Sequence, residues 1–200
     1  MRVLRFVFAF LSIIWGISQA SALAGAPADA VALVERVYAM AFEVAGDRSA
    51  GRPQDGLHVL RDSFDGSAIA RVVLGDRWER AAAGERREFV DALLDAIVGA
   101  LVRRIGRYRA QDVTVVGTRA ISNGDILVRS RLVSPLDDPL TVDWRVRGCG
   151  ARPCIVDLLV GGASVSLERR NDVAARLAAN DGSLSELIAD LRKDAADAVR

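Results

Sequence analysis

The chain has 200 residues, of which 51% are hydrophobic, and its formal net charge at pH 7 is +1. This length indicates a single domain with enough apolar side chains for a sizeable core. So small a net charge gives no general attraction to nucleic acid or to an anionic membrane, which argues against proteins that bind either one electrostatically.

The first 24 residues predict a signal peptide. Arg2 and Arg5 precede the apolar run FVFAFLSIIWGI, and Ala22 and Ala24 have the spacing of a cleavage site. The run is about 12 residues long, too short to span a bilayer comfortably, although an uncleaved anchor is the alternative. Cleavage would remove two of the 27 basic residues and leave 25 against 26 acidic ones. We therefore expect an exported protein with one domain over residues 25–200.

The two cysteines, Cys149 and Cys154, lie in RGCGARPCIV between two runs typical of strands. In an oxidising compartment this spacing favours a disulfide that closes a hairpin loop. A zinc site would need about four ligands, and the single histidine, His58, is far away in the sequence. A redox site would more typically have C-x-x-C spacing. We predict a structural disulfide and no metal site.

Helices are expected in both halves of the chain. Residues 28–45 carry apolar side chains in helical register, and GDRSAGRPQDG after them predicts a loop. SFDGSAIARVVLG predicts a short helix, and residues 84–108 predict the longest one, apolar on most of its circumference. Two more helices close the chain, and Ser183 and Glu186 have the spacing of a capping box at the start of the last.

Between these helices the apolar pattern changes to period two. DVTVVGT, DILVRSRLV, LTVDWRVR and CIVDLLV predict four strands, and in the second of them Val128, Ser130 and Leu132 face away from Arg129 and Arg131. Short turns between the strands indicate an antiparallel sheet with one apolar and one polar face. We expect an α+β domain in which this four-stranded sheet packs against several helices.

The sequence contains no catalytic pattern. It has one histidine and lacks G-x-S-x-G, H-E-x-x-H and Walker-type motifs. LVGGAS is glycine-rich but lacks the lysine of a phosphate-binding loop, and a strand-to-helix corner explains it better. His58 is expected to be a solvated surface residue. We predict a protein that is not an enzyme and requires no cofactor.

Two segments together resemble the MlaC family, also called the toluene-tolerance family. They are FDGSAIARVVLGDRWERAAAGERREFVDALLDAIVGALVRRIGRY and VDLLVGGASVSLERRNDVAARLAANDGSLSELIADL, which keep the order and separation of the family's motifs. Gly161 replaces the family's glutamate and Ala163 its valine. The hopanoid-associated branch of the family fits about as well. The matching positions are Phe64, Ile69, Ala70, Leu74, Gly75, Trp78, Arg86, Phe89, Tyr108, Asp157, Gly162, Ser164 and Leu191.

The resemblance implies a periplasmic lipid carrier with an apolar cavity between sheet and helices, which shelters the lipid tails. It further implies transport of a phospholipid or hopanoid between the inner and outer membranes. The implied partners are an inner-membrane transporter complex and an outer-membrane lipoprotein complex. Asp157 and Ser164 would have structural roles, with Asp157 tying its strand to neighbouring backbone. The candidate lipid-binding residues are Val128, Leu132, Val142, Trp144, Val146, Val156 and Leu158 on the sheet and Ile69, Val73, Trp78, Phe89, Leu93, Ile97 and Leu101 on the helices.

Two alternatives stay open at this point. If the candidate residues fill a solid core, the protein is an exported adaptor or interaction domain without a ligand. The arginines either lie in solvent or dock acidic surfaces of partner proteins, and for those that end the longest helix an anionic headgroup is a further alternative. One group ends the longest helix and consists of Arg103, Arg104, Arg107 and Arg109. The other lies on the polar face of the sheet, where Asp143 is the expected acid, and consists of Arg129, Arg131, Arg145 and Arg147.

Overall fold

The computed structural model describes residues 22–46, 53–134 and 137–199. Residues 1–21 of the predicted signal peptide lie outside this range. No helix among the described residues is long and apolar enough to cross a membrane. In chain order the elements are α1 (Ala22–Gly46), α2 (Pro53–Asp62), α3 (Gly66–Leu74), α4 (Arg77–Arg80), α5 (Ala83–Ile105), a 3-10 turn η1 (Ala110–Asp112), β1 (Val113–Ala120), β2 (Ile126–Ser134), β3 (Asp137–Cys149), β4 (Arg152–Val160), β5 (Ala163–Ser164), α6 (Val165–Ala179) and α7 (Leu184–Val199).

The strands form one antiparallel sheet in the order β1-β2-β3-β4-β5, which confirms the α+β fold. The sheet has five strands where the sequence predicted four. β5 has only two residues, too few to show a period-two pattern. It pairs with Leu159 and Val160 because Gly161 and Gly162, both at positive φ, turn the chain back on itself.

The two faces of the sheet differ as the sequence predicted. In β2, Val128, Ser130 and Leu132 are buried whereas Arg129 and Arg131 are exposed. The alternation breaks in β4, where Val146 pairs with Ile155 and Arg145 with Asp157. The residue between, Val156, is therefore a β-bulge.

The prediction of a loop up to Gly56 is wrong, because α2 already begins at Pro53. Proline is tolerated in the first turn of a helix, where its missing N–H has no partner to lose. Gly56 lies inside α2, where a Cβ would come within 2.5 Å of Val44 Cγ2 and 3.2 Å of Met40 Sδ. The glycine therefore permits α2 to pack closely on α1.

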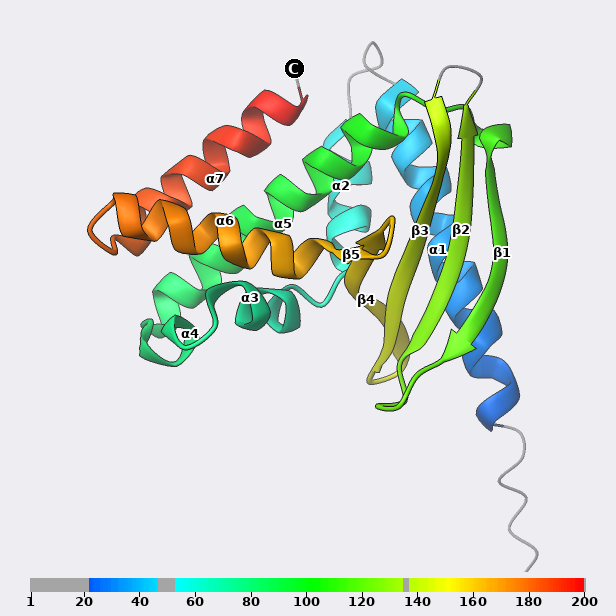
Figure 1. Ribbon diagram of the computed structural model, residues 1–200, viewed down its shortest axis with the longest axis horizontal. Helices are drawn as coiled ribbons and strands as arrows, with labels where there is room; N and C mark the ends of the chain where they lie inside the picture. Colours follow the sequence, from blue (N-terminus) through cyan, green and yellow to red (C-terminus); the bar gives the residue numbers. More distant parts are fainter. Residues whose placement is uncertain (1–21, 47–52, 135–136, 200) are drawn as a thin grey trace, which may run out of the picture.

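The helices form two groups around the sheet (Figure 1). α1 packs across the apolar face of the sheet, and α3, α5, α6 and α7 pack together beside it, against the β4 edge. α5 and α7 make the most extensive helix pair. A single hydrophobic core runs from the sheet through α1, α3 and α5 to α7.

Two polar connections attach the second group of helices to β4. In the first, Asp65 N donates to Ile155 O at 2.8 Å, Ile155 N donates to Ser63 O at 2.8 Å, and the Asp65 side chain caps α3 by accepting from Ala68 N at 2.9 Å. In the second, the carboxylate of Asp157 accepts from Ser164 Oγ at 2.6 Å and from Ser166 N at 3.1 Å.

The second connection confirms the structural roles expected of Asp157 and Ser164. Ser164 is also the N-cap of α6, and its Oγ accepts from Leu167 N at 3.2 Å. The aspartate in the strand therefore fixes the corner at which the chain leaves the sheet. The cap expected for the last helix is present as well, since Ser183 Oγ accepts from Glu186 N at 3.3 Å.

Candidate functional site

The structure places all of the fourteen candidate residues except Val156, the bulge residue, in or against the apolar core. Thirteen of the fourteen are buried and Leu101 is partly buried. They occupy two places, since the sheet residues lie on or next to the face that α1 covers and the helix residues lie in α3, α4 and α5. The interior has a wall that the candidate set omits, because α1 contributes the buried residues Leu33, Val34, Val37, Tyr38 and Ala41.

A polar cluster holds α1 to the apolar face of the sheet. Tyr38 meets Trp144 edge-on with ring centroids 5.1 Å apart, and its hydroxyl lies 2.7 Å from Ser130 Oγ. Trp144 Nε1 donates to Ser130 Oγ at 3.0 Å and to Tyr38 OH at 3.3 Å. Ser130 Oγ donates to Val142 O at 3.1 Å.

The cluster satisfies the polar atoms of three buried side chains. Burial raises the pKa of Tyr38, and the hydrogen bonds with Ser130 and Trp144 offset part of that rise. The phenol is therefore neutral at physiological pH. Sequence reasoning placed Ser130 on the apolar face but gave no partner for it, because Tyr38 lies 92 residues away in the chain.

Trp78 differs from the other candidates in having charged neighbours. It belongs to α4, at the end of the second helix group farthest from the sheet (Figure 1). The guanidinium carbons of Arg71 and Arg86 lie 5.6 and 5.4 Å from the centre of its ring. These are cation–π distances, so the indole has charged neighbours as well as the apolar core.

Three of the hollows lined by described residues have volumes of about 230, 400 and 320 Å³. The first lies over β1 and β2 on the polar side of the sheet, the second among α1, α2 and the β3–β4 hairpin tip, and the third beside Trp78. Trp78 is the only one of the fourteen candidates that lines any of these three. The candidate residues of the sheet are at most 8% exposed, so protein covers them in this conformation.

The polar face of the sheet contains more acidic charge than the sequence predicted. Asp125 is only 1% exposed. Its carboxylate accepts hydrogen bonds from Arg145 Nε at 2.6 Å and from Arg147 Nε at 2.8 Å. Burial alone would raise the pKa of Asp125, but the hydrogen bonds from Arg147, Arg145 and Asn123 outweigh it and lower the pKa to about 2. The prediction that Asp143 is the acid on this face is therefore incomplete.

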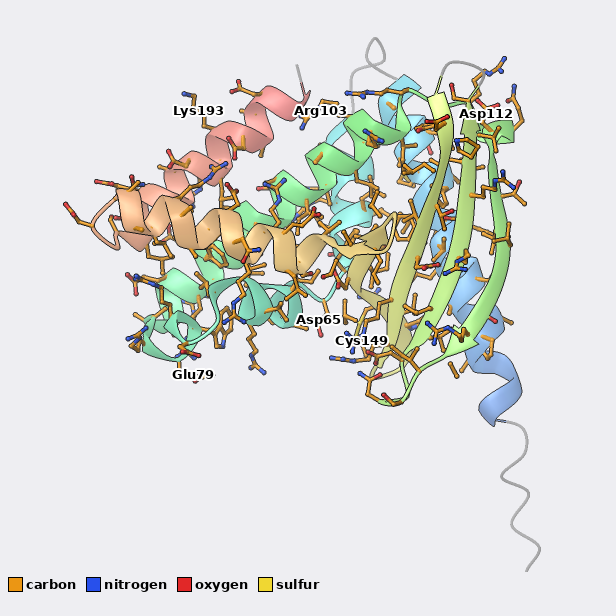
Figure 2. The ribbon with its side chains drawn as sticks, viewed as in Figure 1. Asp65, Glu79, Arg103, Asp112, Cys149 and Lys193 are labelled. Atoms are coloured by element: carbon orange, nitrogen blue, oxygen red, sulfur yellow. A yellow bond between two sulfur atoms is a disulfide. The ribbon has the colours of Figure 1, made fainter. Side chains whose placement is uncertain are left out.

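Asp143 itself forms a bidentate pair with Arg129, at 2.7 and 2.8 Å. Three of the four arginines on this face are thus bound to carboxylates of the same chain. This pairing reduces the positive charge that the face can offer to a partner. Figure 2 shows the polar side chains distributed over the whole molecule.

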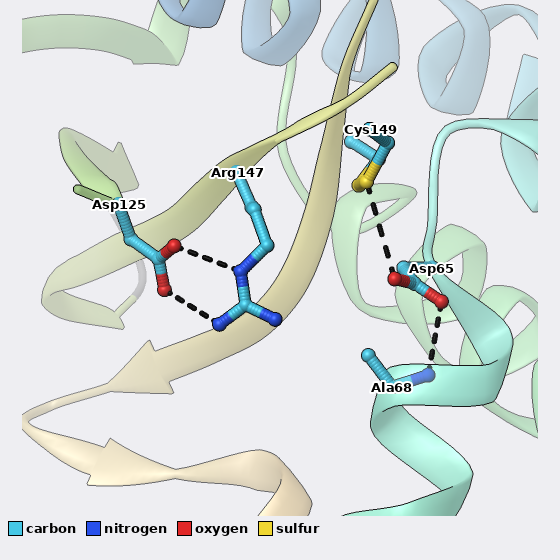
Figure 3. Close-up of a disulfide and its surroundings, with 6 residues drawn as sticks. Asp65, Ala68, Asp125, Arg147 and Cys149 are labelled. Atoms are coloured by element: carbon cyan, nitrogen blue, oxygen red, sulfur yellow. Dashed lines mark hydrogen bonds and ion pairs between the residues drawn. A yellow bond between two sulfur atoms is a disulfide. The ribbon is translucent and has the colours of Figure 1, made fainter. Parts of the chain in front are cut away.

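The predicted disulfide between Cys149 and Cys154 is present, with their Cα atoms 5.8 Å apart. It closes the β3–β4 hairpin next to Asp65, whose Oδ2 lies 3.9 Å from Cys149 Sγ (Figure 3). Asp65, Cys149 and Cys154 bring three potential ligand atoms within 4.8 Å of one another. Sulfurs joined in a disulfide are not thiolates, however, so this cluster is not a metal site while the bond is intact.

Together, the sheet, the helices and the continuous core define a small α+β protein with an apolar interior between its layers. The chain belongs to the MlaC family, since the family model described as "MlaC protein" matches residues 34–193. A solved structure of a phospholipid-binding protein from Ralstonia solanacearum, in complex with a phospholipid, is similar to this chain. Its TM-score is 0.68 at 20% sequence identity, over 88% of this chain and 99% of that chain, which shows a shared fold. Comparison with curated proteins gave no match.

Proposed function

We propose that this protein is a periplasmic lipid carrier that shelters lipid tails in its interior and moves the lipid between the inner and outer membranes. The observation that carries the proposal is the single apolar core that joins the sheet, α1 and the second helix group. Membership of the MlaC family supports it, as does the fold shared with a protein described as binding phospholipid. Binding and transfer of lipid require no catalytic residue.

The energetics explain why such a carrier needs an interior of this kind. Two acyl chains with about 30 methylenes cost roughly 24 kcal/mol to expose to water, at about 0.8 kcal/mol per methylene. A carrier must match the bilayer to within a few kcal/mol, because it otherwise would not release the lipid. Walls of small and medium apolar side chains such as Val128, Val142 and Leu93 meet this requirement.

In the conformation described here the candidate walls are in contact with protein, so tails must enter by separating two layers. We place this opening between the sheet with α1 and the second helix group. The helix candidates lie on one side of it, and α1, which covers the face with the sheet candidates, lies on the other. The hydrogen bonds of Tyr38, Ser130 and Trp144 favour α1 and the sheet moving as one unit.

The packed interior also supports the second candidate function, an exported adaptor without a ligand. Native mass spectrometry of the full chain after gentle purification separates the two. Bound lipid at a one-to-one ratio is the expected result for a carrier. Protein that remains free of lipid after incubation with vesicles would contradict it. Extraction and mass identification of the lipid then distinguish a phospholipid from a hopanoid.

We further propose that a membrane complex docks at the arginines that end α5. Arg103, Arg104 and Arg107 are exposed, and none of them forms an ion pair within the described part of the chain. Docking through rim charges acts mainly on the association rate and is weakened by salt. Replacing Arg103 and Arg107 by Glu should slow lipid delivery to membranes that contain inner-membrane transporter or outer-membrane lipoprotein complexes, whereas Arg131→Glu on the sheet should not. Equal rates for both variants would exclude this surface.

A further inference from the structure

The hollow of about 400 Å³ lies where α1, α2 and the tip of the β3–β4 hairpin meet. Its α1 wall is one face of the helix, because Asp29, Leu33 and Arg36 follow one another at helical spacing. Asp62 comes from the end of α2, and Arg152 from the hairpin tip. None of the fourteen candidate lipid-binding residues lines it.

The lining carries two charges of each sign, and none of them is neutralised internally. Asp29, Arg36, Asp62 and Arg152 are all exposed. No ion pair or side-chain hydrogen bond joins any of these four to another residue that the structure describes. On the polar sheet face, by contrast, Asp125 is bound by arginines at 2.6 and 2.8 Å. The four charges of this hollow therefore remain available to a ligand.

The floor of the hollow belongs to the apolar core. Leu33 is 3% exposed and is a member of the core as well as part of the lining. Val59, which is 42% exposed, adds an apolar patch to the wall. A ligand with a charged group and an apolar chain would thus find both kinds of surface within one hollow.

Two of the walls, the hairpin tip and the end of α2, are fixed relative to each other before any ligand binds. The disulfide between Cys149 and Cys154 closes the hairpin tip. Ile155 N donates to Ser63 O at 2.8 Å, and Ser63 Oγ donates to Val59 O at 3.0 Å. These bonds connect the tip to the end of α2, so the backbone of these two walls does not have to be ordered on binding.

We propose that this hollow binds a zwitterionic group made of a phosphate and an ammonium, with Arg36 and Arg152 at the phosphate and Asp29 and Asp62 at the ammonium. The net charge of the four side chains is zero, which fits such a group better than an anion. The headgroup of an aminophospholipid has this chemistry. If the ligand is such a lipid, the inference rests on the proposed function. Free O-phosphorylethanolamine has the same chemistry without the tails.

Lipid competition tests the proposal on the full chain. The protein is incubated with vesicles of equal parts phosphatidylethanolamine and phosphatidylglycerol with matched acyl chains, and the bound lipid is quantified by mass spectrometry. We expect phosphatidylethanolamine to be enriched. Asp29→Asn combined with Asp62→Asn should lower the ratio of the two lipids roughly three- to tenfold, the effect expected for losing ion contacts at a partly exposed site.

The arginine variant and a matched control complete this test. Arg36→Gln combined with Arg152→Gln should reduce the uptake of both lipids, because both carry a phosphate. Asp76→Asn combined with Arg80→Gln, exposed charges at α4, should behave as the unchanged protein. The headgroup assignment would be overturned if the aspartate variant and the arginine variant both showed the same lipid ratio and the same uptake as this control.

A second arm uses O-phosphorylethanolamine and inorganic phosphate in place of vesicles, with chemical-shift changes in the protein as the readout. If the protein takes up no lipid, the proposed function fails, and this arm still tests the hollow. A soluble zwitterionic ligand would be supported if O-phosphorylethanolamine changed the chemical shifts of the protein and the aspartate and arginine variants both lost these changes. If neither the lipid ratio nor the shifts depend on these four residues, the hollow does not recognise a zwitterion.

Discussion

Removing the hydroxyl of Ser130 should destabilise this protein more than removing the hydroxyl of Tyr38. Each variant, Ser130→Ala or Tyr38→Phe, deletes one oxygen atom from the same buried cluster. The difference arises from the direction of the hydrogen bonds. Ser130 Oγ uses its only proton on Val142 O, so Tyr38 must be the donor in the 2.7 Å bond between the two hydroxyls.

The magnitudes follow from the partners that each variant leaves behind. Ser130→Ala removes the acceptor of the Tyr38 hydroxyl proton. It also leaves Trp144 Nε1 with only its 3.3 Å contact to Tyr38 OH. An unsatisfied buried group costs about 1–3 kcal/mol, so this variant should lose roughly 2–4 kcal/mol. Tyr38→Phe leaves Ser130 Oγ bound to Trp144 and Val142. The 2.7 Å bond to Ser130 and the long 3.3 Å bond from Trp144 Nε1 are lost, but no buried polar atom is left without a partner. The cost should therefore be only about 0.5–1.5 kcal/mol.

Urea unfolding measures both variants, and a change in stability alone shifts the midpoint without changing the slope. Ser67→Ala is the control, because Ser67 is exposed and the substitution should stay within about 0.5 kcal/mol of the unchanged protein. If Tyr38→Phe were as destabilising as Ser130→Ala, the assigned direction of the hydrogen bonds would be refuted.

Three further predictions concern the acid, the disulfide and the interior. Because its pKa is lowered, Asp125 should contribute about 2 kcal/mol to the free energy of unfolding above about pH 4, and this contribution should be lost toward pH 2. Asp125→Asn should flatten the stability profile there, and an unchanged profile would contradict this. Replacing Cys149 and Cys154 by Ser should cost about 2 kcal/mol in unfolding; two free thiols in the unreduced exported protein would disprove the bond. Leu93→Trp should abolish lipid uptake at nearly unchanged stability if the interior opens. A loss of roughly 1–3 kcal/mol in stability, with binding retained in the folded fraction, would indicate a solid core.

The features that the sequence predicted correctly depend on residues close together in the chain. The alternation of Ser130 with Arg129 and Arg131 requires only neighbouring positions, and so does the disulfide across a hairpin. The cap at Ser183 likewise depends on a residue three positions away. Local spacing is sufficient for each of these, because the backbone geometry of strands, hairpins and helix starts fixes which residues meet.

The features that were missed depend on distant pairs. Asp125 becomes a buried ion-pair centre because Arg145 and Arg147 reach it from β3, 20 and 22 residues later. The sequence predicts a loop over the first turn of α2 because Pro53 and Gly56 disfavour helix in isolation, and the close packing of α2 on α1 outweighs that preference. No local pattern contains either interaction.

The bulge in β4 explains how an apolar strand can include an aspartate. In a regular strand Ile155 and Asp157, two positions apart, would share one face. The extra residue, Val156, puts them on opposite faces, because Ile155 pairs with the inward-facing Val146 and Asp157 with the outward-facing Arg145. Ile155 is consequently 0% exposed in the core, whereas the carboxylate reaches the corner that begins α6. Strict alternation from the sequence assigned Val156 to the inner wall and overlooked Ile155. A single inserted residue therefore allows β4 to serve both the apolar interior and the polar connection to the helices.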